Sequence, residues 1–303
     1  MSRAAVIDVG TNSVRLLIAD FGEIGLKIQL KEILTTRLGK GVDRDRRLSS
    51  QAINNTLDAI RKFRDRAISL GAGNVLVIAT SAVRDAVNGE TFMQEVKKLA
   101  VRTKILTGNE EAELGFLGAC LGIGNIEGKV LLIDIGGGST ELVLGSGNAI
   151  HYMTSLDIGA VRLTEKFGNS NTASRCQLDS ISDFVKKQLS GMEFPNNQEI
   201  ARMVGIGGTI TSLAAIDQKL EIYDRNAVHG YVLQKEQIDR ILELMLCLTL
   251  EERQKIPGLQ RERADIIVAG IIILKCVMEY FAQHEIHVSE WDNLEGAVYK
   301  WWS

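Results

Sequence analysis

Apolar positions along the chain follow two spacings, one typical of helices and one of buried strands. In segment 49–70, Ile53, Leu57 and Ile60 recur at helical spacing, whereas 74–79 (NVLVIA) is a short apolar run. The same criteria predict strands at 26–37, 104–106, 149–156, 203–206 and 287–289, and helices at 89–101, 109–121, 178–189, 234–246, 263–283 and from about 294 onward. Strands and helices that alternate in this way predict an α/β protein.

One seven-residue pattern occurs twice in the chain. Ile7–Ser13 (IDVGTNS) resembles Ile133–Ser139 (IDIGGGS), and the offset between matching residues is 126 throughout. A short apolar run lies on each side of both copies, which predicts two β-hairpins with Gly/Asn/Ser turns. We therefore expect two related α/β domains that face each other across a cleft, one formed by 1–124 plus 290–303 and the other by 125–289.

Composition and charge exclude several classes of protein. The 303 residues include 35 Lys and Arg against 38 Asp and Glu, and a net charge of −3 does not favour a general nucleic-acid or membrane-surface binder. The longest apolar run, 266–274, is nine residues long, short of the roughly 20 that a membrane span needs. Asp8 interrupts the apolar stretch near the N-terminus, so we expect no signal peptide and a cytoplasmic protein. The four cysteines and four histidines lack the spacing of a zinc site, and the cysteines do not form a disulfide pattern.

Three glycine-rich turns follow apolar strands and could bind phosphate. Glycines allow backbone N–H groups to converge on a phosphate, and neighbouring hydroxyl groups add donors. The third turn precedes a short predicted helix at 212–215, whose N-terminus would favour an anion. The turns match neither the Walker A nor the Rossmann spacing. A single turn of this kind is equally well a flexible loop. Two turns at matching places in a repeat, together with a third, favour a phosphate-binding cleft. The candidate phosphate-binding residues are Gly10, Thr11, Asn12, Ser13, Gly136, Gly137, Gly138, Ser139, Thr140, Gly207, Gly208 and Thr209.

Two carboxylates stand on the arms of the second predicted hairpin. Asp134 and Glu141 are seven residues apart, and a turn between them can bring both side chains toward one point. Oxygen ligands of this kind suit Mg²⁺ or another divalent cation. Glu141 is equally well an exposed strand residue, an alternative that the spacing leaves open.

Longer strings in the chain resemble one protein family. They are Asp8–Ser13 (DVGTNS), Ala79–Arg84 (ATSAVR), Gly108–Ala112 (GNEEA), Asp134–Glu141 (DIGGGSTE), Gly205–Thr209 (GIGGT), Val228–Gly230 (VHG) and Arg263–Asp265 (RAD). The order of the turns resembles the actin, Hsp70 and sugar-kinase superfold, and the strings resemble the signature blocks of the exopolyphosphatase/guanosine pentaphosphate phosphohydrolase (Ppx/GppA) family in its short two-domain form. The resemblance implies two related actin-like (ribonuclease H-like, ASKHA superfold) domains flanking a cleft. It also implies Mg²⁺-dependent removal of the terminal phosphate from inorganic polyphosphate, from guanosine pentaphosphate (pppGpp), or from both.

The resemblance also implies roles for individual residues. Glu110, Glu111 and Glu113 fall in the first turn of a predicted helix, where acidic residues commonly complement the helix dipole. The family pattern selects Glu111 among them as the general base. It carries Arg84 into the active site, although an arginine at a helix start can also be solvated. The residues implied to be metal-associated are Asp134, Glu141 and, as a weaker candidate, Asp8.

Other residues depart from the family pattern or remain outside it. The family reads Leu-Arg-Glu-Gly near the C-terminus, but Leu294 stands here in place of the arginine, so a role of that arginine has no matching residue. A basic set could line a polyphosphate path, although interleaved acidic residues favour a solvated surface. This set is Arg37, Lys40, Arg44, Arg46, Arg47, Arg61, Lys62 and Arg64. His229 is either a cleft residue or a core histidine, and Trp291, Trp301 and Trp302 are expected to anchor the last helix.

These inferences favour an enzyme, an exopolyphosphatase, with a pppGpp 5′-phosphohydrolase as an alternative that the motifs do not separate. An ATP-dependent kinase of the same superfold would leave the glutamate pair and Arg84 unexplained. A non-catalytic phosphate sensor would not need the acidic residues that are present. We expect inorganic polyphosphate or pppGpp as substrate, Mg²⁺ or another divalent cation as cofactor, and a monomer or homodimer that binds neither membranes nor a specific nucleic acid.

Overall fold

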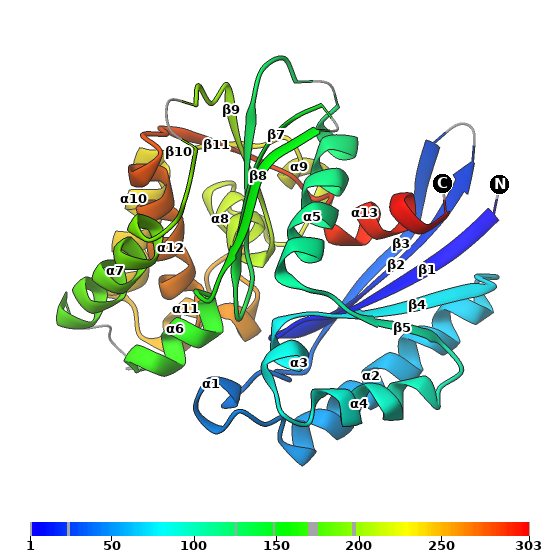
Figure 1. Cartoon of the computed structure of the whole chain (residues 1–303). Helices are drawn as coiled ribbons and strands as arrows, with labels where there is room; N and C mark the ends of the chain where they lie inside the picture. Colours follow the sequence, from blue (N-terminus) through cyan, green and yellow to red (C-terminus); the bar gives the residue numbers. More distant parts are fainter. Residues whose placement is uncertain are drawn as a thin grey trace. The chain divides into compact units, whose positions relative to one another are not determined.

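The computed structural model describes residues 2–22, 25–124, 126–147, 149–168, 175–195 and 198–302 (Figure 1). The chain divides into two compact units, Met1–Leu121 with Asp292–Ser303, and Gly122–Trp291. Each unit has its own sheet and its own hydrophobic core. Among the helices in the described ranges, none is both long and apolar enough to cross a membrane.

The sheet of the first unit has five strands in the order β3-β2-β1-β4-β5. Its strands are β1 (Ser2–Val9), β2 (Ser13–Gly22), β3 (Gly25–Thr35), β4 (Asn74–Ala79) and β5 (Arg102–Ile105). The first three form an antiparallel meander, and β4 and β5 run parallel to β1. The predicted hairpin at the first glycine turn is therefore the β1–β2 hairpin.

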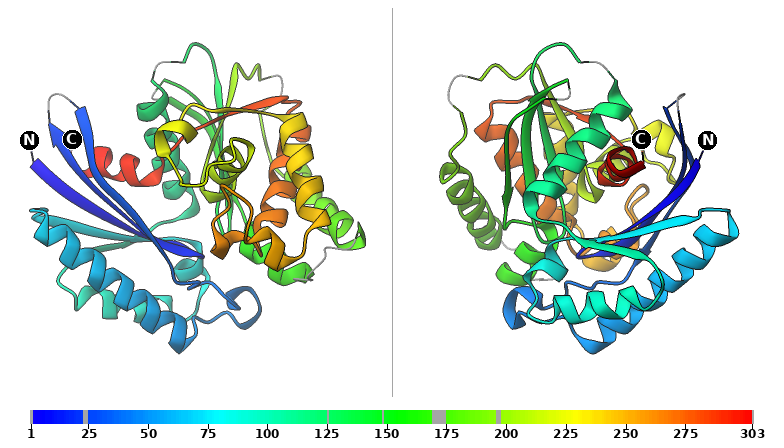
Figure 2. Two further views of the ribbon diagram at one scale, coloured as in Figure 1. Left: turned by 180° about the vertical axis from the view of Figure 1, so that it is seen from behind. Right: turned by 45° about the vertical axis from the view of Figure 1, so that its right-hand side comes forward.

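Helices cover both faces of this sheet. They are α1 (Val42–Asp45), α2 (Ser50–Ser69), α3 (Ser81–Asp85), α4 (Gly89–Lys97), α5 (Gly108–Ile123) and α13 (Asn293–Trp302). Figures 1 and 2 show α2 and α4 on one face and α13 on the other. Neighbouring residues of β1 point to opposite faces, so Ile7 packs in one core with Phe63 of α2, whereas Val6 packs in another with Leu114 of α5 and Val298 of α13.

The sheet of the second unit repeats this strand order with one addition. Its strands are β6 (Val130–Ile135), β7 (Thr140–Ser146), β8 (Ala149–Leu156), β9 (Arg202–Ile206), β10 (Val232–Gln234) and β11 (Glu285–Val288). The order is β10-β11-β9-β6-β7-β8, in which β6, β7 and β8 form an antiparallel meander and β9 and β11 run parallel to β6. Only the edge strand β10 has no counterpart in the first sheet. The shared order confirms the predicted repeat and the actin-like α/β fold class.

The second unit is built around one apolar helix. Its helices are α6 (Ala160–Phe167), α7 (Arg175–Ser190), α8 (Gly208–Asp217), α9 (Arg225–Val228), α10 (Lys235–Cys247), α11 (Leu250–Arg253), a 3-10 turn η1 (Arg261–Arg263) and α12 (Ile267–Tyr280). Helix α12 is buried along most of its length, and α6, α7 and α10 pack against it. This matches the expectation of a core helix from its long apolar run.

Two helices are shorter than predicted. The helix predicted at 89–101 ends at Lys97, and the one predicted at 263–283 runs from Ile267 to Tyr280. Ala100 and Ala282, close beyond these ends, adopt left-handed backbone conformations with φ of 56° and 51°. A left-handed residue stops a helix, but glycine is its usual sequence signal and alanine gives none.

Candidate active site

The two repeated turns have the same backbone geometry. In the first, the Gly10 N–H donates to Ser13 O at 3.0 Å, and in the second the Gly136 N–H donates to Ser139 O at 3.0 Å. Each turn joins the first two strands of its unit's sheet. The repeated sequence therefore produces the same local structure in both units.

The first turn is buried and leaves one polar group for a ligand. Thr11, Asn12 and Ser13 are each less than a tenth exposed. The Thr11 hydroxyl forms a 2.8 Å hydrogen bond with the Ser81 hydroxyl. Among the described residues, the Asn12 Nδ2 amide has no hydrogen-bond partner although it is buried. A buried donor of this kind is costly unless a ligand or water accepts from it, which fits the predicted phosphate-binding role of Asn12.

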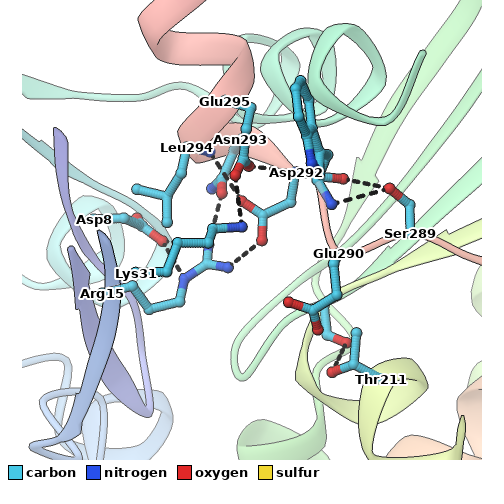
Figure 3. A network of polar contacts seen from close by, with 12 residues as sticks. Asp8, Arg15, Lys31, Thr211, Ser289, Glu290, Asp292, Asn293, Leu294 and Glu295 are labelled. Atoms are coloured by element: carbon cyan, nitrogen blue, oxygen red, sulfur yellow. Dashed lines mark hydrogen bonds and ion pairs between the residues drawn. The ribbon is translucent and has the colours of Figure 1, made fainter. Parts of the chain in front are cut away.

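An arginine neutralises the carboxylate at the start of the first turn. Arg15 Nη2 and Nε donate to Asp8 Oδ2 at 2.5 and 3.0 Å, and Arg15 Nη1 donates to Asp292 Oδ2 at 2.5 Å (Figure 3). Arg15 Nη2 also donates to Asn293 Oδ1 at 2.6 Å. Burial raises the pKa of the Asp8 carboxyl, and the charge of Arg15 opposes that rise. Asp8, the weaker metal candidate, thus already has a cationic partner within the protein.

The same network fixes the last helix and explains Leu294. Lys31 Nζ forms a 2.7 Å ion pair with Glu295 Oε1, and Glu295 is fully buried (Figure 3). Glu295 Oε2 accepts from the Asp292 N–H at 3.0 Å. Leu294 is buried in the apolar cluster that also holds Val6. The position at which the family pattern has arginine is therefore a core position here and cannot reach a phosphate.

The second turn has two carboxylates at the positions that an aspartate and an arginine occupy in the first turn. Asp134 and Glu141 are directly opposite each other in the β6–β7 ladder, as Asp8 and Arg15 are in the β1–β2 ladder. Directly opposite side chains have Cβ atoms about 5 Å apart. Glu141 is almost completely buried, and its Oε1 accepts from Ser155 Oγ at 2.6 Å. Two like charges this close repel each other unless a cation lies near them.

Polar groups around the second turn are partly used within the protein. The Thr140 hydroxyl donates to Ile158 O at 2.5 Å, so its only proton is not available to a phosphate, contrary to the predicted role of this side chain. The Val161 N–H donates to Gly137 O at 2.8 Å, and Arg162 Nε donates to Gly138 O at 2.7 Å. These bonds hold two carbonyl groups of the turn in place. Because the Gly136 N–H bonds Ser139 O, the Gly137 and Gly138 N–H groups are the donors that remain for a ligand.

The third turn lies against the second one. Strand β9 pairs with β6, and Gly207, with φ of 88°, ends β9 so close to Asp134 that a Cβ atom there would be 2.4 Å from Asp134 Oδ1. The Arg263 guanidinium covers Gly208, where a Cβ atom would be 2.0 Å from Arg263 Nη1. Helix α8 begins here, so its N-terminal N–H groups and an arginine lie together. The Thr209 side chain packs against Gly270 of α12, which leaves its N–H as its contribution to an anion site.

The three glutamates of α5 have different surroundings. Glu110 forms a capping box with Thr107, whose N–H donates to Glu110 Oε2 at 2.9 Å, and it also pairs with Lys104 at 2.6 Å. Glu113 pairs with Lys300 at 2.6 Å. Glu110 therefore caps the start of α5, as its place in the first helical turn predicts, and Glu113 joins α5 to α13.

Glu111 is the buried member of this group. It is 8% exposed, and Arg84 Nη1 donates to its Oε2 at 3.2 Å. The same Arg84 nitrogen donates to Leu106 O at 3.0 Å, which fixes the guanidinium. A buried carboxylate oriented by a fixed arginine is a geometry that suits a general base.

A sequence model of the Ppx/GppA phosphatase family matches residues 17–303. The chain belongs to this family. It is 33% identical, over 98% of its length and 97% of the relative's, to exopolyphosphatase 2 of Mycobacterium tuberculosis. It is 35% identical to a bifunctional 3-dehydroquinate synthase/phosphatase of Fusobacterium nucleatum, of which the match spans 46% of the length. The crystal structure of the Aquifex aeolicus Ppx/GppA family member is 33% identical, with a TM-score of 0.84 over 99% of this chain and 97% of that one.

Within this Ppx/GppA protein, each unit gathers its own share of the predicted site residues. The first unit holds the first turn together with Glu111 and Arg84, and the second holds Asp134 and Glu141 with the second and third turns. Sequence reasoning missed Arg15, although the repeat offset of 126 pairs it with Glu141. It also gave no role to Arg263, although Arg263 begins one of the strings that carry the family resemblance.

The remaining candidates have structural roles. His229 Nδ1 accepts from the Glu290 N–H at 3.1 Å, so its Nε2 donates to Gly122 O at 3.1 Å, as expected of a packed histidine. Trp301 and Trp302 contact Lys104 and Arg102 through cation–π interactions at 5.5 and 5.8 Å, and so hold α13 on β5. All four cysteines are free, and the described ranges contain no cluster of three or more His, Cys, Asp or Glu suited to a metal.

Proposed function

We propose that this phosphatase is an exopolyphosphatase that hydrolyses the terminal phosphate of inorganic polyphosphate. The observation that carries the proposal is the carboxylate pair Asp134 and Glu141, which flanks the second glycine turn in a protein of a phosphatase family. The choice of polyphosphate is supported by the 33% identity to a relative named exopolyphosphatase 2 over nearly the whole chain.

A divalent cation fits the second turn. Asp134 and Glu141 supply oxygen atoms of the type that Mg²⁺ prefers, and Mg²⁺ is commonly held by one or two carboxylates together with substrate phosphates and water. Binding by only two carboxylates is compatible with the described residues, which contain no group of three or more His, Cys, Asp or Glu suited to a metal. When bound, the cation would neutralise charge on the phosphate oxygens. Asp134 and Glu141 would hold it, with Ser155 fixing the Glu141 carboxylate.

The glycine turns provide donors for the phosphate groups. Backbone N–H groups at the second and third turns, together with the N-terminus of α8 and Arg263, favour bound negative charge. In the first turn, Asn12 Nδ2 adds a donor that has no partner among the described residues. Fixed donors of this kind stabilise charge that develops on the phosphate during transfer.

Glu111 is the proposed general base. It accepts a proton from a water molecule whose oxygen forms a bond to the terminal phosphorus, while the bond from phosphorus to the bridging oxygen breaks. The products are inorganic phosphate and a polyphosphate chain shorter by one unit. Arg84 holds the Glu111 carboxylate in one orientation through its 3.2 Å contact.

The test is phosphate release from long-chain polyphosphate, pppGpp and ATP measured side by side, with Mg²⁺ and with EDTA. Polyphosphate should be the best substrate by kcat/KM, and EDTA should abolish release until Mg²⁺ is restored. The Glu111→Gln variant should lose about 99% of the activity or more on every substrate and serves as the control for contaminating phosphatases. A higher kcat/KM for pppGpp would overturn the choice of substrate, and full activity in EDTA would overturn the metal assignment.

A further inference from the structure

The loop between β3 and α2, residues 36–48, carries a concentrated positive charge. It contains five basic and two acidic residues, a formal charge of +3 in a chain whose net charge is −3. Lys40, Arg46 and Arg47 are exposed, and their side chains form no ion pair with any residue in the described ranges. Arg44, by contrast, is paired with Asp45 at 2.7 Å. Three cations of this loop are thus available to a ligand from solution.

Backbone hydrogen bonds fix the start of this loop on the first glycine turn. The Thr36 and Arg37 N–H groups donate to Asn12 O at 3.2 and 2.8 Å, and the Gly39 N–H donates to Thr11 O at 2.9 Å. A Cβ atom at Gly39 would lie 2.2 Å from Thr11 Cγ2, so the loop passes the turn at a distance that requires glycine. The basic loop therefore begins directly at a predicted phosphate-binding turn.

The end of the loop is fixed close to the helix that carries Arg84. The Val87 N–H donates to Arg46 O at 2.9 Å, and Asn88 bonds both backbone groups of Leu48, at 2.8 and 3.0 Å. Residues 87 and 88 follow α3, the helix of Arg84, and α1 within the loop contacts α3 (Figure 1). Both ends are thus held beside groups already placed in the catalytic machinery.

The backbone of the loop gives a second indication. Arg37 and Arg46 both adopt a left-handed conformation with φ of 52°. Glycine adopts this conformation without steric cost, whereas for other residue types it costs on the order of 1 kcal/mol of conformational free energy. Backbone requirements therefore do not explain arginine at position 46, whose exposed side chain has no ion pair in the described ranges.

We propose that Lys40, Arg46 and Arg47 bind phosphate groups of the polyphosphate chain that follow the terminal one, and so give the enzyme a preference for long chains. This inference rests on the proposed function, because it needs a substrate with many phosphates in a row. Exposed cations attract such a polyanion, and guanidinium groups bind phosphate in a bidentate way. The other predicted basic segment is less suitable, because Arg61 pairs with Asp58 and Arg64 with Asp65.

The test replaces the three cations by glutamine in one variant, Lys40→Gln/Arg46→Gln/Arg47→Gln. The matched control is Lys27→Gln/Lys62→Gln/Lys97→Gln, which removes the same charge from exposed lysines of the same unit outside the loop. For the loop variant, KM for long-chain polyphosphate should rise about tenfold, while KM for tripolyphosphate and both kcat values stay within about twofold. The control should change every value by less than about twofold. The rise of long-chain KM with salt should also be less steep in the loop variant.

Equal KM values for wild type and loop variant on long chains, or the same rise for tripolyphosphate or for the control, would overturn the inference. If the wild type released phosphate from neither chain length, the proposed function would fail on its own. Equilibrium dialysis of long-chain polyphosphate would then decide the inference. Binding weakened in the loop variant but not in the control would support it, and unchanged binding would overturn it.

Discussion

The first and second glycine turns share one backbone and differ in the charge of a single strand residue. In the β1–β2 hairpin, Arg15 stands opposite Asp8 and neutralises it. In the β6–β7 hairpin, Glu141 occupies the matching place opposite Asp134. The first turn therefore has an arginine beside its aspartate, and the second has a glutamate in the matching place.

Because of this difference, the two hairpins have different partners in the structure. The arginine of the first hairpin also bonds Asp292 and Asn293, so the first turn is tied to the last helix of the chain (Figure 3). The second hairpin has a glycine contact to the third turn instead, at Gly207. The first turn is thus joined to the last helix by an ion-pair network, and the second is the proposed site for a cation and phosphate.

The largest effect should follow from giving the second hairpin the charge pattern of the first. Glu141→Arg would place an arginine opposite Asp134 and remove the negative charge that attracts the cation. We expect kcat/KM for polyphosphate with Mg²⁺ to fall by about 10³-fold or more. Phosphate release under steady-state conditions gives the value.

Because Glu141 is buried, the smaller change Glu141→Gln serves as a second variant. It should lose activity in the same direction with its circular dichroism spectrum and thermal midpoint close to those of the wild type. Activity of Glu141→Gln within about tenfold of the wild type would show that the second carboxylate does not hold a catalytic cation.

The next largest effect concerns the stability of the first hairpin. Arg15→Gln would remove the cation that pairs with the buried Asp8 and Asp292 carboxylates, which should lower the free energy of unfolding by about 3 kcal/mol in urea titrations. The matched control is Arg3→Gln, because Arg3 pairs with Asp20 across the same two strands but at a more exposed place. Arg3→Gln should lower the free energy of unfolding by only a small fraction of the loss in Arg15→Gln. Equal losses for the two variants would show that Arg15 is an ordinary surface partner.

The glutamates of α5 should separate by function. Glu111→Gln removes the proposed proton acceptor and should lower kcat about 10²-fold or more with little change in KM. Glu110→Gln should be near neutral for activity and Glu113→Gln mild, because their partners are Thr107, Lys104 and Lys300. All three variants are compared in one assay. If Glu110→Gln were the most damaged, the general base would be misassigned by one residue.

The smallest effect is a pH dependence at the start of α5. The side chain of Lys104 and the backbone of Thr107 lower the pKa of Glu110 below its ordinary value. A lowered folded-state pKa contributes stability above the ordinary pKa, and this contribution disappears as the pH falls through the lowered value. Glu110→Gln should therefore cost about 0.5 kcal/mol at neutral pH and progressively less in acid, measured by urea unfolding at several pH values. A difference that stayed constant into acid would contradict the charged capping role.

The hairpins, the repeat and most helices could be predicted from local sequence patterns, because these elements depend on residues close in sequence. The 126-residue offset gave both turns, and the string around Glu111 selected the buried glutamate of three. The predicted helix ends at 101 and 283 were wrong by several residues, because the left-handed conformations of Ala100 and Ala282 have no signal in an alanine.

What could not be predicted depends on partners distant in sequence. Arg15 bonds Asp292, 277 residues away, and no local pattern links the two. The Thr140 hydroxyl was assigned to phosphate, but it donates to Ile158 after the chain returns through β7 and β8. Arg263 gains its place over Gly208 only through the packing of the second unit. These side chains acquire their roles from tertiary contacts.

The most direct test of the contrast between the two hairpins is cation binding itself. Titration with Mn²⁺, followed by electron paramagnetic resonance in the presence of tripolyphosphate, would compare the Glu111→Gln background with the same background carrying Glu141→Gln or Arg15→Gln. The contrast predicts that Glu141→Gln abolishes protein-dependent Mn²⁺ binding and that Arg15→Gln leaves it within about twofold, since the first hairpin supplies its own cation. Undiminished Mn²⁺ binding in Glu141→Gln, or its loss in a folded Arg15→Gln protein, would contradict that central claim.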